Sequence, residues 1–412
     1  MLLMTSFALV GSLAVLLAFW SAGIRRAPVS EPLLALLLGV LAGPVTNLVD
    51  IPDPAVTGLT LEIGRVLLAI SLMAVALRFP VAGYRSVLRP VTVLLTAGML
   101  GMAVLTAGLA WWLLGLPVAL AALLGACLTP TDPVLAASVV SGGPAARQLP
   151  ARLRQVISAE SGGNDGLAFT FVVVALAATT GGSWSQRLAE VLWGVFGAAL
   201  IGLVAGYVAG RAVRGAMSRE EVDSGSLLIF ALVLAVAVLG VGRLAYTDGI
   251  LAVFVAGLAY NAVIDSRSRV SQQRLDDSLT RYLVLPLFFL LGAELPWRGW
   301  LDLGWAALAF PAAVLLLRRL PVALALHPAL RLPWRDTLFL GWFGPIGVSA
   351  LFYLSYSHEE GVRDPNLWAV GTLVVAASTL VHGVTAMPGR RRYAGLSQPQ
   401  RRPSARTACD VR

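Results

Sequence analysis

The sequence predicts an all-α polytopic membrane protein of about thirteen transmembrane helices. Of its 412 residues 58% are hydrophobic and only 13% are charged, and the mean hydropathy is +0.80, more apolar than a water-soluble domain can bury. The apolar residues recur in blocks of about 20, the length at which a helix crosses roughly 30 Å of hydrocarbon. Strands of a membrane barrel would instead alternate apolar and polar residues.

Charged residues and clusters of proline and glycine divide the chain into the expected spans. The first expected span lacks the basic leading region of a secretory signal, so we expect it to be retained. The spans cover approximately residues 3–23, 31–48, 60–77, 90–114, 117–141, 155–180, 188–210, 225–242, 246–263, 282–296, 302–317, 336–357 and 366–387.

The arginines predict the orientation of these spans. All 31 basic residues are arginine, and with the C-terminal tail in the cytoplasm, alternate connections hold 26 of them. The opposite connections hold 4, and Arg65 alone lies within a span. We therefore expect an external N-terminus and a cytoplasmic C-terminus. The sixth of the arginine-rich connections is assigned Arg318, Arg319, Arg331 and Arg335.

The composition also excludes several classes of function. The chain has no lysine, which excludes a Walker phosphate loop and a Schiff-base enzyme. Its only cysteines, Cys127 and Cys409, lie far apart and imply neither a disulfide framework nor a metal cluster. The net charge of +9 follows from orientation and requires no nucleic-acid partner. Because the loops are short, activity is expected among the helices, without a cofactor and without enzymatic chemistry.

The fifth span contains a carboxylate between two prolines. Pro130 and Pro133 remove backbone donors around Asp132, which leaves carbonyl groups without helical partners in mid-span. Such a broken helix is tolerated where it lines a cavity, and its free ends can hold a cation while Asp132 caps the second half. The alternative is a proline kink in which Thr131 and Asp132 satisfy one another.

The sixth span brings two acids into the bilayer within six residues. Glu160 and Asn164 are four residues apart, as are Ser161 and Asp165, so each pair shares a helix face. Hard monovalent cations prefer such carboxylate, hydroxyl and carbonyl oxygens, and burial of a carboxylate lets a proton compete with a cation for it. The alternative is a hydrated loop at the cytoplasmic mouth.

The second half of the chain offers a counterpart for the broken helix. Gly341, Gly344, Pro345 and Gly347 interrupt the twelfth span, and two discontinuous helices in corresponding halves indicate an inverted-repeat transporter. The thirteenth span carries His382, which is either a proton relay or a hydrogen bonder in helix packing.

These motifs resemble those of the monovalent cation:proton antiporters, specifically the NhaP-like sodium/proton exchangers, over nearly the whole chain. The matching segments are Thr131-Asp132-Pro133, Glu160-Ser161-x-x-Asn164-Asp165, Phe288 to Leu295, Phe343-Gly344-Pro345 and Val381 to Thr385. The resemblance implies a thirteen-helix fold with a dimerisation domain and a core domain in which two broken helices cross.

The resemblance also implies the roles of individual residues. Asp165 would bind cation and proton alternately, and Ser161, Thr131 and Asp132 would complete the site. The Asn164-Asp165 pair goes with electroneutral exchange, whereas two adjacent aspartates go with electrogenic exchange. The family commonly has an arginine after the Gly-Pro of the twelfth span, paired with the glutamate that matches Glu160. Here that position is Ile346, so the partner of Glu160 is left open.

We therefore expect Na⁺/H⁺ antiport across the cytoplasmic membrane, serving pH homeostasis, by a homodimer in contact with membrane lipid. Residues 1–388 would form the membrane domain, with site helices at about 90–180 and 302–387, and residues 389–412 a basic, disordered cytoplasmic tail. The alternatives are exchange of K⁺ or of both cations, with Li⁺ a further candidate, and a non-transporting membrane sensor with the same fold.

Overall fold

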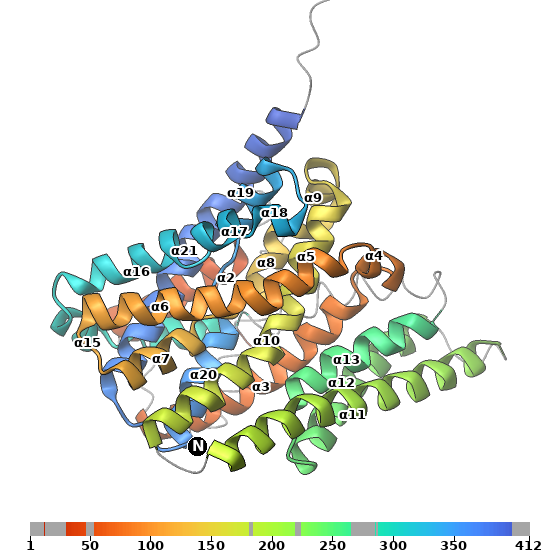
Figure 1. Ribbon diagram of the computed structural model, residues 1–412, viewed down its shortest axis with the longest axis horizontal. Helices are drawn as coiled ribbons and strands as arrows, with labels where there is room; N and C mark the ends of the chain where they lie inside the picture. Colours follow the sequence, from red (N-terminus) through yellow and green to blue (C-terminus); the bar gives the residue numbers. More distant parts are fainter. Residues whose placement is uncertain are drawn as a thin grey trace, which may run out of the picture.

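The computed structural model describes residue 12 and residues 30–46, 53–180, 184–218, 224–264, 285 and 287–397. The described residues form helices and no strands, which confirms the predicted fold class (Figure 1). The helices are α2 (Glu31–Val40), η1 (Leu41–Val45), α3 (Asp53–Leu77), α4 (Val81–Ser86), α5 (Leu88–Val93), η2 (Leu94–Gly98), α6 (Met99–Leu114), α7 (Val118–Cys127), α8 (Pro133–Val140), α9 (Gly142–Gln148), α10 (Ala151–Thr180), α11 (Trp184–Ser218), α12 (Ser224–Leu244), α13 (Gly249–Val263), α15 (Trp297–Asp302), α16 (Ala306–Leu317), α17 (Leu320–Ala325), α18 (His327–Leu330), α19 (Trp334–Trp342), α20 (Val348–Glu359) and α21 (Pro365–Ser397).

Several of these helices are long and apolar enough to cross a membrane. Within the described residues five segments meet that criterion, namely Leu88–Leu114, Ala151–Thr179, Ser185–Met217, Ala306–Ala325 and Pro365–Leu396. The chain is therefore a multi-pass membrane protein. The count of thirteen spans stays a prediction, since most of the first expected span lies outside the described residues.

Helix α10 runs through the middle of the bundle, with α11, α12 and α13 grouped on one side and α6 and α16 on the other (Figure 1). Glycines bring α10 and α13 together: a Cβ on Gly166 would meet Leu251 at 2.8 Å, and one on Gly162 would meet the ring of Phe254. Gly162 precedes Gly166 on α10, whereas Phe254 follows Leu251 on α13, so the two helices run antiparallel.

Both expected helix breaks are present. The fifth span divides into α7 and α8 around residues 128–132, and the twelfth divides into α19 and α20 around residues 343–347. The backbone N–H of Asp132 donates to the carbonyl of Pro345 at 2.8 Å, so the two breaks touch where they cross. The sixth span, in contrast, continues as one helix through Glu160 and Asp165.

The assignment of Arg318 and Arg319 to a cytoplasmic loop is wrong. Both lie within the apolar segment Ala306–Ala325, between α16 and α17, and they are only 2% and 4% exposed. The eleventh span therefore continues past residue 317. Both arginines are buried because carbonyl groups of the broken helices and the carboxylate of Glu160 on α10 accept their hydrogen bonds, as described below.

The expected disorder from residue 389 is wrong as far as residue 397, because α21 continues to Ser397 despite Pro388. The guanidinium of Arg390 donates to the carbonyls of Ser138 and Val139 at the end of α8. The hydroxyl of Tyr393 donates to the carboxylate of Asp336 in α19. The end of α21 is thus tied to both broken helices. Residues 398–412 lie outside the described residues.

This tie predicts that Arg390→Ala lowers the melting temperature of the purified protein. The carbonyls of α8 would lose a charged donor, which costs about 1–3 kcal/mol. The matched control is Arg391→Ala, because Arg391 is exposed and such substitutions stay within about 0.5 kcal/mol. Thermal unfolding in detergent measures both variants, and equal melting temperatures would show that α21 is not held by Arg390.

Candidate functional site

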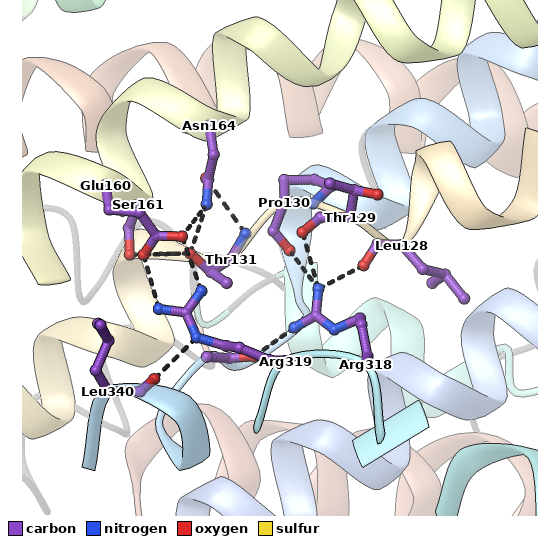
Figure 2. Close-up of polar contacts among 11 residues, drawn as sticks. Leu128, Thr129, Pro130, Thr131, Glu160, Ser161, Asn164, Arg318, Arg319 and Leu340 are labelled. Carbon is purple, nitrogen blue, oxygen red and sulfur yellow. Dashed lines mark hydrogen bonds and ion pairs between the residues drawn. The ribbon is translucent and has the colours of Figure 1, made fainter. Parts of the chain in front are cut away.

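The polar centre of the molecule lies where α10 passes the break between α7 and α8 (Figure 2). The amide of Asn164 donates to the hydroxyl of Thr131 at 2.8 Å and to Oε1 of Glu160 at 2.9 Å. The hydroxyls of Thr131 and Ser161 lie 3.2 Å apart, and the backbone N–H of Thr131 donates to Oδ1 of Asn164 at 3.3 Å. The structure therefore brings together four of the predicted site residues, all of them buried.

Glu160 is paired with Arg319, which answers the question left open by Ile346. The guanidinium of Arg319 donates to both carboxylate oxygens of Glu160, at 2.7 and 2.9 Å, and through Nε to the carbonyl of Leu340 at 2.9 Å (Figure 2). Ile346 is buried, and its backbone N–H donates to the hydroxyl of Ser378. Arg319, which lies between α16 and α17, thus links α10 to α19.

Asp132 accepts hydrogen bonds at the amino-terminal ends of α8 and α20, the second halves of the two broken helices. Its Oδ1 accepts from the N–H groups of Val134 and Leu135 at 2.8 Å, which caps α8 as the sequence suggests. Its Oδ2 accepts from the N–H of Val348 at 2.5 Å, at the start of α20. One negative charge thus compensates the positive ends of two helix dipoles. The approach requires a glycine, because a Cβ on Gly347 would collide with this carboxylate.

Arg318 donates to the carbonyl ends of α7 and α19, the first halves of the two broken helices. Its Nη1 donates to the carbonyls of Leu128 and Thr129 at 2.6 and 2.8 Å, just after α7. Its Nη2 donates to the carbonyl of Gly344 at 2.6 Å, just after α19. These carbonyls have lost their helical partners at the breaks, and a buried cation is the complement that their partial negative charge requires.

Asp165 differs from the other buried carboxylates of the centre. It is fully buried, and neither carboxylate oxygen has a hydrogen-bond partner among the described residues. Its carboxyl interacts electrostatically with those of Asp132 and Glu160, and the hydroxyl of Ser349 lies beside it without forming a hydrogen bond to it. Its backbone carbonyl accepts from the hydroxyl of Tyr353, which holds α10 against α20. A buried carboxyl without a partner is costly unless it takes up a proton or a cation.

His382 lies away from this group. Its Nε2 is 3.0 Å from the carbonyl of Trp342, and its Nδ1 is 3.0 Å from the carbonyl of Ser378. These contacts join α21 to the end of α19. The geometry therefore places His382 as support for the second broken helix, and no hydrogen bond links it to Asp165 among the described residues.

Sequence reasoning missed Arg318, Arg319, Ser349 and Tyr353. The two arginines interrupt an apolar segment that continues to Ala325, and this continuation was the available signal that they do not lie in a loop. Ser349 and Tyr353 are four residues apart on α20, a spacing that puts both on the face next to α10. No group of three or more metal-ligating acids, histidines or cysteines occurs in the part of the chain that the structure describes.

Comparison with protein families gives one match over almost the whole chain. The family described as "Sodium/hydrogen exchanger, transmembrane" matches residues 12–388. The chain is 32% identical over 347 residues to "Na(+)/H(+) antiporter 2" of Zygosaccharomyces rouxii, which covers 79% of this chain and 42% of that protein. The chain therefore corresponds to less than half the length of that relative.

Two further comparisons concern a relative named for a different cation and a solved structure with a similar fold. The chain is 27% identical over 421 residues to "K(+)/H(+) antiporter NhaP2" of Shewanella sp. (strain MR-4), covering 98% of this chain and 70% of that protein. The solved structure of the sodium proton antiporter MjNhaP1 from Methanocaldococcus jannaschii at pH 8 superposes with a TM-score of 0.78. It is 19% identical and covers 96% of this chain and 98% of that one, which shows the shared fold.

The Glu160 and Arg319 pair predicts strong coupling between the two side chains. Glu160→Gln or Arg319→Gln alone leaves one buried charge unpaired and should cost about 3–5 kcal/mol, whereas the double variant should lose much less than the sum. Thermal unfolding of the four proteins measures the coupling. Arg187→Gln is the control, because its pair with the exposed Glu190 should contribute at most about 1 kcal/mol. Additive losses at Glu160 and Arg319 would contradict a direct pair.

Proposed function

This chain belongs to the sodium/hydrogen exchanger family, and from that premise we propose that it is a secondary antiporter that exchanges Na⁺ for H⁺. The observation that carries the proposal is the Asp165 carboxyl, which is fully buried and has no hydrogen-bond partner among the described residues. A proton or a cation neutralises such a group, and the two exclude one another. The opposing ion gradients drive the exchange without a cofactor.

Coupling follows from this exclusion. A cation that binds Asp165 displaces its proton, and a proton that binds displaces the cation. Because an empty, charged carboxyl is expensive to carry through an apolar barrier, only the loaded site changes sides. Each movement of a cation in one direction is therefore matched by movement of a proton in the other.

The neighbouring residues have separate supporting roles. Ser161 and Thr131, whose hydroxyls lie 3.2 Å apart, would supply neutral oxygen ligands to the bound cation. Asn164 would position both its neighbour Asp165 and the broken helix, through its bonds to Thr131 and Glu160. Asp132 is a positioning residue, because its oxygens are occupied by the N–H groups of the crossing.

We propose that the exchange is electroneutral. Glu160 is held by Arg319, and Asp132 is held by the ends of two helices, so their charges stay constant through the cycle. Among these three carboxyls, Asp165 alone is left to change its ligand. One site that holds either one Na⁺ or one proton moves equal charge in both directions.

A K⁺/H⁺ antiporter is the second candidate, because the Shewanella relative carries that name. For the remaining features, we propose a homodimer in the cytoplasmic membrane, contacting lipid, with an external N-terminus and a cytoplasmic C-terminus. We also propose a membrane domain over residues 1–388, with the site helices within about 90–180 and 302–387. The basic tail would then be limited to the residues after 397.

The first test is Asp165→Asn in proteoliposomes. Asparagine cannot exchange a proton for a cation, so Na⁺-driven movement of protons should fall to the level of empty vesicles. A pH-sensitive dye with Na⁺, K⁺ and Li⁺ in turn measures the exchange and its ion preference. Asp302→Asn is the control, since Asp302 is exposed and should leave the rate unchanged. Normal exchange by Asp165→Asn would exclude the mechanism.

The second test concerns charge. If the exchange is electroneutral, the rate of ²²Na⁺ uptake driven by a pH gradient should be the same when a K⁺ diffusion potential of either sign is clamped with valinomycin. An electrogenic exchanger would speed up under one sign of potential and slow down under the other. A dependence of the initial rate on the clamped potential would therefore overturn the one-for-one assignment.

A further inference from the structure

A second buried carboxyl without a full set of partners lies outside the site described above. Asp248 is the residue before α13, and its Oδ1 accepts from the N–H groups of Ile250 and Leu251 at 2.9 and 3.1 Å. It is 5% exposed, and its Oδ2 is buried with no hydrogen-bond partner among the described residues.

Asp248 packs beside a part of α10 that is nearer to Thr180 than Asp165 is. Leu251 lies against Gly166, and because α13 is antiparallel to α10, residues before Leu251 lie toward the Thr180 end of α10. The carboxyls of Asp248 and Asp165 interact electrostatically, and both interact with the hydroxyl of Tyr353. A line of polar groups therefore leads from Asp165 toward the end of the bundle opposite the arginine-rich start of α10.

A helix cap does not explain this residue. Capping uses one oxygen, and serine, threonine or asparagine provides it without a charge that must be buried. A negative charge here faces the carboxyl of Asp165, and no ion pair to Asp248 occurs in the part of the chain that the structure describes. Such a group is stable when its second oxygen holds a proton or a metal cation.

A cluster of ion pairs lies next to the start of α13, close to Asp248. Arg243, whose side chain lies beside Gly249, donates to Glu62 at 3.3 Å, and Glu62 also pairs with Arg65. The guanidinium of Arg65 lies 5.4 Å from the ring of Phe352, the residue before Tyr353.

We propose that Asp248 is a second binding site for the transported monovalent cation, located between Asp165 and the predicted external surface. This inference rests on the proposed function. A cation arriving from that side meets the free Oδ2 of Asp248 before it reaches Asp165, and its charge offsets the repulsion between the two carboxyls. A cation arriving from the cytoplasmic side reaches Asp165 without passing Asp248.

The test is the side dependence of Asp248→Asn. Asparagine keeps the cap of α13 but loses the charge, so the fold and melting temperature should be preserved. Sodium-dependent exchange is measured in right-side-out and inside-out vesicles. We expect the apparent KM for Na⁺ at the external face to rise about tenfold, as for loss of one charged ligand, with the cytoplasmic KM unchanged.

Asp248→Ser, which also caps the helix without a charge, should give the same one-sided change, and Asp302→Asn should give none. If both neutral caps change KM by the same factor on the two faces, or change it on neither face, the proposal is overturned. This failure is distinct from failure of the proposed function. If the proposed function is wrong, the unaltered protein itself shows no exchange, and Asp165→Asn then causes no loss.

Discussion

The site depends on the neutralisation of four helix ends where α7–α8 and α19–α20 cross. Breaking two helices inside an apolar bundle exposes backbone groups that no water is available to satisfy. Asp132 supplies the negative charge for the two N–H ends, and Arg318 supplies the positive charge for the two carbonyl ends. Because each ion spans both breaks, the two half-helix pairs are held as one unit, and the glycine at position 347 gives the carboxylate room to reach across.

The Arg319–Glu160 pair joins this crossing to α10. A buried ion pair contributes little net stability, but it fixes geometry, since its loss on one side leaves an unpaired charge. Here Arg319 balances the charge of Glu160, and the neutral amide of Asn164 adds hydrogen bonds to both Thr131 and Glu160. The charges of the polar centre therefore balance one another, and the carboxyl of Asp165 is the one group left without a partner among the described residues.

The sequence predicted the broken helices because Pro130, Pro133 and Pro345 are incompatible with continuous helices in mid-span. Asp132 was identified as a cap for the same local reason. Arg318 and Arg319 were misplaced because hydropathy assigns adjacent arginines to water. Only a structure shows the distant carbonyls of Leu128 and Gly344 that accept from Arg318 and the carboxylate of Glu160 that accepts from Arg319. The helical end of α21 was missed likewise, since its stability comes from Arg390 and Tyr393 reaching other elements and not from apolar periodicity.

The buried acids divide into two kinds according to whether both oxygens are occupied. Glu160 and Asp132 use both oxygens on fixed donors, so binding a mobile ion would cost them existing bonds. Asp165 uses neither oxygen and Asp248 uses one, so each has an oxygen to which an ion would bind without breaking an existing bond. Since both also interact with Tyr353 on α20, movement of the second broken helix would change the surroundings of the two carboxyls together. The crossing of the two broken helices thus affects both of the proposed ion-binding carboxyls.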